Sequence, residues 1–228
     1  LREMGVAQNT LVWFMSDNGG LPGLDPPTTG GLRNFKGSMY EGGLRVPAII
    51  EWPNGISKVR VTKHPAGAVD IFPTIAEIVG LEKSDLLKPQ DGMSLAKLFL
   101  KELGPRQKPL PFRSRGRVAV VDNYYKMISF PDDGKIRYEL YNLDNDMSEQ
   151  DNLLNKEPKI ANRLRKKLKA IDASVTASVN GHDYPEKKVA LQPPRIFWWE
   201  RESYRPYLSE WSKRPEYSQR LKRHIESQ

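Results

Sequence analysis

The chain has 228 residues, of which 38% are hydrophobic and 28% charged, and it carries a formal net charge of +8. This composition is typical of a globular protein, and no apolar run is long enough to cross a bilayer. There is no cysteine, which excludes disulfides and thiolate metal sites and leaves the redox compartment undetermined. No Asn-x-Ser/Thr sequence is present, so the sequence leaves secretion open.

The first ten residues, LREMGVAQNT, are typical of the last turn of a helix that closes at Gly5. A chain that opens within an element is expected to have lost its beginning. Any targeting segment would then lie upstream.

An apolar run from Leu11 to Met15 predicts a strand that is buried on both faces, as in a parallel sheet. Asp17 and Asn18 follow the run and are themselves followed by two glycines, which permit a sharp turn or a close approach of the backbone. In open α/β sheets, ligands lie at this carboxyl end of the strands.

The middle of the chain contains one short predicted helix and a proline-rich stretch. GAVDIFPTIAEIVGL places Asp70 at a helix start, Pro73 in its first turn and Gly80 at its end. LGPRQKPLP, with three prolines, is the best candidate for a domain boundary.

Three β-rich runs follow this boundary and lead into a basic helix. The runs are GRVAVVDN, YYKMISFP and IRYELYNL, and the triplet Asp132-Asp133-Gly134 predicts a hairpin. In KEPKIANRLRKKLKAI, apolar residues form one helical stripe while basic residues occupy the other faces. We therefore expect a small antiparallel sheet with a helix packed on one face.

The positive charge raises the question of nucleic-acid binding. The basic side of the helix is better explained as a solvated face than as a phosphate contact. The last stretch, RIFWWERESYRPYLSEWSKRPEYSQRLKRHIESQ, mixes arginine with aromatic residues that can stack on bases, but it also holds five glutamates that would repel phosphates. It is interpreted as a packed or partner-facing tail, and no nucleic-acid partner is expected.

An ordered series of motifs resembles the second half of a type I sulfatase, a family of the alkaline-phosphatase-like superfamily. The series is SDNGG, GLRNFKGSMYEGGLRVPAIIEWP, AVDIFPTIAEIVG, DGMSL and ELYNLDNDMSEQDNL. The resemblance implies the C-terminal part of a doubly wound α/β domain, residues 1–104, followed by a small antiparallel sheet with a packed helix, residues 112–180. Residues 181–228 would form an aromatic and basic tail.

The resemblance also assigns roles to particular residues. Asp17 and Asn18 match the pair that helps to hold a divalent cation, usually Ca²⁺, which prefers hard oxygen ligands. The alternative is an Asx-type turn in which both side chains bond only to nearby backbone. Lys36 matches the lysine that reaches the substrate sulfate and is both the substrate-binding and the catalytic candidate; its alternative is an exposed loop lysine.

Other polar residues near these motifs receive structural interpretations. Glu41 and Arg45 are expected to form an ion pair that braces the loop. None of the three histidines, at positions 64, 182 and 224, has a pattern that indicates a general base. His64 is expected to be a surface or packing residue, and a role in the substrate cleft stays open.

The catalytic nucleophile of the family is missing from this chain. Type I sulfatases use a formylglycine made within a Cys/Ser-x-Pro-x-Arg motif, and the nearest pattern here, Ser129-Phe130-Pro131, has Asp133 in place of the arginine. The formylglycine is therefore expected upstream of this chain, which would be a sulfatase fragment that is inactive alone. The alternatives are an inactive sulfatase-like binding or structural chain and a phosphodiesterase-like member of the superfamily.

Partners and location follow only from the resemblance. A sulfated small molecule or glycan is the expected substrate, and a basic chain is compatible with a polyanionic glycan. Association with the missing N-terminal half, or self-association, is expected because an isolated apolar strand leaves an open edge. Members of the family are typically secreted, periplasmic or lysosomal, whereas this sequence by itself does not indicate a cellular location.

Overall fold

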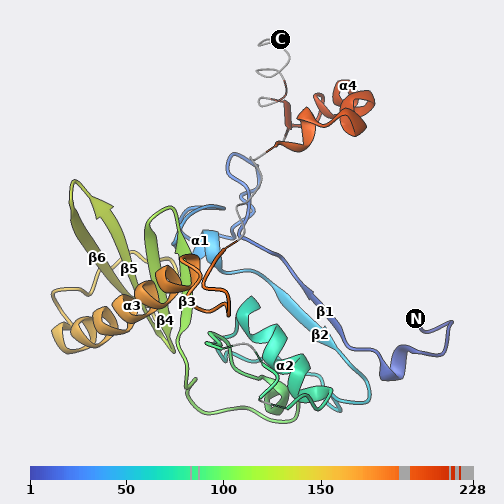
Figure 1. Cartoon of the computed structure of the whole chain (residues 1–228), viewed down its shortest axis with the longest axis horizontal. Helices are drawn as coiled ribbons and strands as arrows, with labels where there is room; N and C mark the ends of the chain where they lie inside the picture. The colour runs from blue at the N-terminus through green and yellow to red at the C-terminus, as the bar shows by residue number, and fades with distance from the viewer. Residues whose placement is uncertain (83, 87, 190–195, 216, 219–220, 222–228) are drawn as a thin grey trace. The chain divides into compact units, whose positions relative to one another are not determined.

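The computed structural model describes residues 1–82, 84–86, 88–189, 196–215, 217–218 and 221. It divides into two compact units, Leu1–Lys187 and Lys188–Gln228, and each is treated by itself. Figure 1 shows their elements. Among the described residues, none of the helices combines the length and the apolar character needed to cross a membrane.

The first unit begins with a turn and a two-stranded ribbon. Residues 2–5 form a turn that closes at Gly5, where φ is +71°. The last turn of a helix that the sequence predicts here is not present in the described residues. A 3₁₀ turn follows at Ala7–Asn9, and β1, Val12–Met15, then pairs antiparallel with β2, Ala48–Glu51.

The expectation that the first strand is parallel and buried on both faces is not met among the described residues. Trp13 and Met15 are half-buried, whereas Val12 and Phe14 are exposed. The reason is that β1 has a single described partner strand, and only the Trp13 face of the ribbon packs on an aromatic ring, that of Phe99.

The helix predicted after Asp70 is present. A 3₁₀ turn at Ala68–Asp70 leads into α2, Ile71–Ile78, and Gly80 follows with a φ of +75°. The Asp70 carboxylate accepts hydrogen bonds from the backbone N–H groups of Gly67 and Met93, at 2.9 Å each. A further 3₁₀ turn lies at Ala96–Phe99.

The proline-rich stretch is held down by a buried ion pair. Arg106 donates two hydrogen bonds to the Asp70 carboxylate, at 2.9 and 2.7 Å, and both side chains are fully buried. This fixes the stretch against the start of α2. The domain boundary proposed there remains a prediction.

The four-stranded antiparallel sheet contains the predicted β-rich runs in sequence order. Its strands are β3, Leu110–Ser114; β4, Arg117–Asp122; β5, Tyr125–Asp132; and β6, Lys135–Asn142. The hairpin predicted at residues 132–134 is confirmed, because Asp132 pairs with Lys135 across two residues of positive φ.

The sheet is covered on both faces. The basic helix α3, Pro158–Val179, packs on one face through Ala161, Leu164 and Leu168, as the apolar stripe predicted (Figure 1). The other face contacts the segment around Met39 and Tyr40. The loop that carries Lys36 is therefore anchored directly on the sheet.

The second unit is short and rich in aromatic residues. Its described elements are two 3₁₀ turns, Trp198–Glu200 and Glu202–Tyr207, and the helix α4, Leu208–Trp211. His224 and the end of the tail lie outside the described residues.

Candidate functional site

Asp17 and Asn18 lie in the turn that follows β1. Asp17 is exposed and Asn18 is half-buried. The Ser16 hydroxyl donates to the Asn18 carbonyl at 2.8 Å, but neither the Asp17 nor the Asn18 side chain hydrogen-bonds to another described residue. Among the described residues the Asx-type turn is thus not formed, and the cation-binding role of both side chains remains a prediction.

The segment around Lys36 lies beside this turn. The Lys36 backbone N–H donates to the Gly20 carbonyl at 2.9 Å, and the Gly19 N–H donates to the Gly43 carbonyl at 3.0 Å. The Lys36 side chain is exposed. The structure therefore brings together the two loops that carry the predicted site residues.

Glycines permit this close contact of two backbones. A Cβ atom added to Gly19 would lie 1.9 Å from the Gly42 carbonyl oxygen, and one added to Gly42 would lie 2.0 Å from that of Asn34. Any side chain at these positions would force the loops apart. Gly37 serves differently, since its φ of +88° is a conformation that favours glycine.

The predicted brace, Glu41 with Arg45, is confirmed, and it belongs to a larger buried network. The Arg45 Nε atom lies 2.5 Å from the Glu41 carboxylate. Lys126 on β5, whose side chain is completely buried, contacts Glu41 at 2.8 Å and Glu149 at 2.9 Å. Glu149 in turn accepts a hydrogen bond from the Glu41 N–H at 2.6 Å.

Sequence reasoning missed Lys126 and Glu149. The available signal was a single lysine inside YYKMISFP, which is otherwise free of charge and predicted to be a strand. A buried lysine requires a carboxylate partner. Here the partners come from positions 85 and 23 residues away, so the sequence alone does not identify them.

A second network joins the same loop to β6. The Arg33 guanidinium lies 3.9 Å from the centre of the Tyr40 ring and donates to the Tyr141 hydroxyl at 3.0 Å. Both tyrosine hydroxyls donate to Glu139, at 2.7 and 2.8 Å. Burial raises the pKa of Tyr40 to about 12, with the hydrogen bond to Glu139 as the next cause.

These contacts define the kind of cation site that the chain can contribute. Asp17 and Asn18 offer hard oxygen atoms, the type that Ca²⁺ prefers, but about six to eight oxygens complete a calcium site. Within the described residues, no group of three or more His, Cys, Asp or Glu side chains could hold a metal ion. The donor chemistry fits part of a calcium site.

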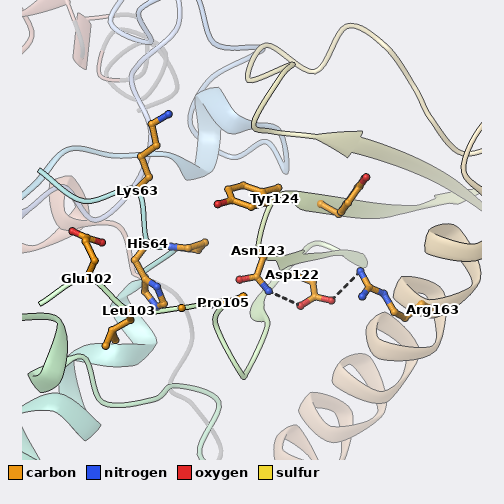
Figure 2. A pocket seen from close by; sticks show the side chains of 12 residues that line it. Lys63, His64, Glu102, Leu103, Pro105, Asp122, Asn123, Tyr124 and Arg163 are labelled. Carbon is orange, nitrogen blue, oxygen red and sulfur yellow. Dashed lines mark hydrogen bonds and ion pairs between the residues drawn. The ribbon is translucent and has the colours of Figure 1, made fainter.

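A separate cavity of about 460 Å³ lies between the segment at residues 63–65, the stretch at 102–105 and the turn after β4 (Figure 2). His64 lines it, half-buried, and burial lowers the pKa of its imidazole, with the nearby Arg106 charge as the second cause. Lys36 and Asp17 do not line this cavity. His182 is exposed and follows the C-terminal end of α3 in the sequence.

Ser129, in the nearest match to the nucleophile motif, is a structural residue. It is buried on β5, and its hydroxyl donates to the Val118 carbonyl at 3.3 Å. This position agrees with the interpretation that the motif is not the nucleophile site.

Comparison with known proteins agrees with this arrangement. Residues 1–81 match the family model for sulfatases. This chain carries a sulfatase-family segment. A sulfatase of Formosa agariphila is 36% identical over 188 residues, which cover 73% of this chain and 33% of the relative. Human arylsulfatase A is 36% identical over 134 residues, covering 54% of this chain and 25% of the relative.

A solved structure extends the likeness to the fold. The sulfatase PsFucS1 from Pseudoalteromonas sp. is 25% identical, with a TM-score of 0.61, and the match covers 81% of this chain and 40% of that one. The chain thus has the α/β fold of the C-terminal region of sulfatases. It spans about a third of the length of the Formosa relative, so a sulfatase activity is proposed for the longer protein and not shown for this chain.

Proposed function

We propose that this sulfatase-family chain contributes the cation-binding and sulfate-binding residues of a sulfuric ester hydrolase. In this proposal Asp17 and Asn18 supply oxygen ligands to Ca²⁺, and Lys36 binds the substrate sulfate. The formylglycine nucleophile would be supplied by upstream sequence of a longer polypeptide. The observation that carries the proposal is the pair of backbone hydrogen bonds, from Lys36 to Gly20 and from Gly19 to Gly43, that holds the two loops side by side.

The chemistry of each residue supports its role. The Lys36 ammonium is a compact cation that suits a tetrahedral oxyanion, and it is exposed for contact with a substrate. The oxygens of Asp17 and Asn18 have no described hydrogen-bond donor that would compete with a cation. When bound, Ca²⁺ would offset the negative charge that develops on the sulfate oxygens.

The buried networks support a positioning role for the sheet. Glu41, five residues after Lys36, is fixed to the sheet by Lys126, and Tyr40 is fixed by Glu139. A loop held at two consecutive residues keeps its lysine in place, which catalysis by positioned charge requires.

The remaining part of the site would come from the N-terminal half of the longer protein. The outer face of the β1–β2 ribbon exposes Phe14 by 64% and Ile49 by 65%. Apolar side chains exposed together at an open strand edge favour association. We expect the chain alone to self-associate at rising concentration in sedimentation experiments, and the double variant Phe14→Lys, Ile49→Lys to remain monomeric.

The test begins with the polypeptide from its natural source. Its intact mass and peptide map should show upstream sequence with a formylglycine, and it should hydrolyse an aryl sulfate. Lys36→Met should raise KM for the aryl sulfate, whereas Lys58→Met, at another exposed lysine, should leave KM unchanged. Equal effects of the two variants, or faster hydrolysis of a phosphate or phosphonate ester than of the sulfate, would reject the proposal.

A further inference from the structure

The loop that carries Lys36 is closed at its base by a backbone hydrogen bond. The Gly42 N–H donates to the Arg33 carbonyl at 2.9 Å, so residues 33 and 42 meet while Lys36 lies between them. Two residues of positive φ, Asn34 at +58° and Gly37 at +88°, turn the backbone on either side of Lys36. The direction of the Lys36 side chain therefore depends on how the base of the loop is held.

The Arg33 side chain fastens the first end of this loop. Its Nη1 atom donates to the Tyr141 hydroxyl on β6 at 3.0 Å and to the Glu149 carbonyl at 2.8 Å. Its guanidinium also lies over the Tyr40 ring, 3.9 Å from the ring centre. Three separate parts of the chain thus contact one half-buried arginine.

These contacts differ in kind from those at the other end of the loop, where a buried ion pair joins Lys126 to Glu41. Among the described residues, Arg33 forms no ion pair, and its charge meets two neutral oxygens and an aromatic face. A planar guanidinium can donate at its edge while its face contacts a ring, and the two contacts together fix its orientation. Arg33 is therefore an independent fastening of the same loop.

We propose that Arg33 is a positioning residue for Lys36, which it directs toward the substrate sulfate by fixing the base of the loop. The inference rests on the proposed function, in which Lys36 binds that sulfate. Arg33 acts through the loop and not on the substrate, because both N–H groups of Nη1 donate within the protein. Loss of Arg33 would let the loop sample other positions, so the cost would fall on sulfate binding.

The test is a double-mutant cycle in the longer polypeptide, with hydrolysis of an aryl sulfate as the readout. Arg33→Met should raise KM by about three- to tenfold, whereas a mere loss of folded enzyme lowers the apparent kcat and leaves KM unchanged. In a Lys36→Met background the same change should alter KM by less than about twofold, because no ammonium is left to position. Arg33→Lys, which keeps a cation and a donor, should give an intermediate KM. If Arg33→Met does not fold, the cycle with Arg33→Lys decides.

Arg113→Met is the matched control, because Arg113 joins β3 to α3 through Asp172, at 2.9 Å, and none of its described interactions involves the loop. It should leave KM unchanged. Additive effects of the Arg33 and Lys36 changes on KM, or equal effects of Arg33→Met and Arg113→Met, would overturn the inference and leave the role of Lys36 intact. An unchanged KM in Lys36→Met itself would overturn the proposed function, and this inference with it.

Discussion

Replacing Lys126 by methionine tests whether the sheet holds the candidate site loop by charge. Methionine retains the apolar stem but removes the ammonium that lies 2.8 Å from Glu41 and 2.9 Å from Glu149. Glu41 keeps Arg45 as a partner, whereas Glu149, whose side chain is fully buried, loses its only described ion-pair partner. Removing one member of a buried ion pair costs about 3–5 kcal/mol.

The cost should depend on pH in a direction that the network fixes. Burial already raises the pKa of Glu149 above its ordinary value of 4.5, and the Lys126 charge opposes that shift. Without Lys126 the pKa of Glu149 rises further, so the folded state holds a proton that the unfolded state has lost. Stability is then retained below about pH 4.5 and falls as pH rises toward the raised folded-state pKa.

Urea unfolding of the chain at pH 7 and at pH 4.5 measures both effects, with Lys135→Met, at an exposed position on β6, as the control. We expect Lys126→Met to lower the free energy of unfolding by about 3 kcal/mol or more at neutral pH and by clearly less at the acidic pH. A loss below about 1 kcal/mol, or the same loss at both pH values, would refute the reasoning.

Three further predictions follow from close contacts and buried groups. Gly42→Ala should destabilise the chain by about 1–3 kcal/mol, because its Cβ would meet backbone at 2.0 Å, whereas Gly104→Ala, with open space, should change the unfolding midpoint little. Arg106→Met should cost about 3–5 kcal/mol in urea unfolding by leaving Asp70 buried without its cation, and a smaller loss than for Gly42→Ala would contradict the burial of that pair. Because the pKa of Tyr40 is raised to about 12, the stability that its neutral hydroxyl contributes is fully present below pH 10 and is lost as pH rises through about 12. Alkaline absorbance titration should show one late-titrating tyrosine fewer in Tyr40→Phe.

The sequence predicted those parts of the fold that depend on local pattern. The stripe at Leu164 and Leu168 required only helical periodicity, and the hairpin at Asp133-Gly134 required only residues that tolerate positive φ. The pairing of β1 with β2 was not predicted, because register between distant strands depends on which partners are present. The apolar run looked buried, yet burial is decided by what covers each face.

In the candidate site, too, features set by local sequence were predicted and features set by distant contacts were not. Motif order alone predicted Asp17, Asn18 and Lys36 as members of one site, and the proximity of their loops depends on glycines whose spacing the sequence does display. The support beneath the loop was not predicted, because Lys126 and Glu149 have no motif and meet Glu41 only after the chain has folded. The aromatic cluster of the tail likewise depends on which rings surround Trp198, which no periodicity encodes.

The most direct test of the central claim is the calcium dependence of sulfate-ester hydrolysis by the polypeptide from its natural source. Activity should be lost on chelation and restored by Ca²⁺. Asp17→Ala should require at least about tenfold more Ca²⁺ for half-maximal activity, as expected for loss of a charged oxygen ligand, while Lys36→Met should raise KM without changing that requirement. An unchanged calcium requirement in Asp17→Ala would contradict the assignment of this turn to the cation site.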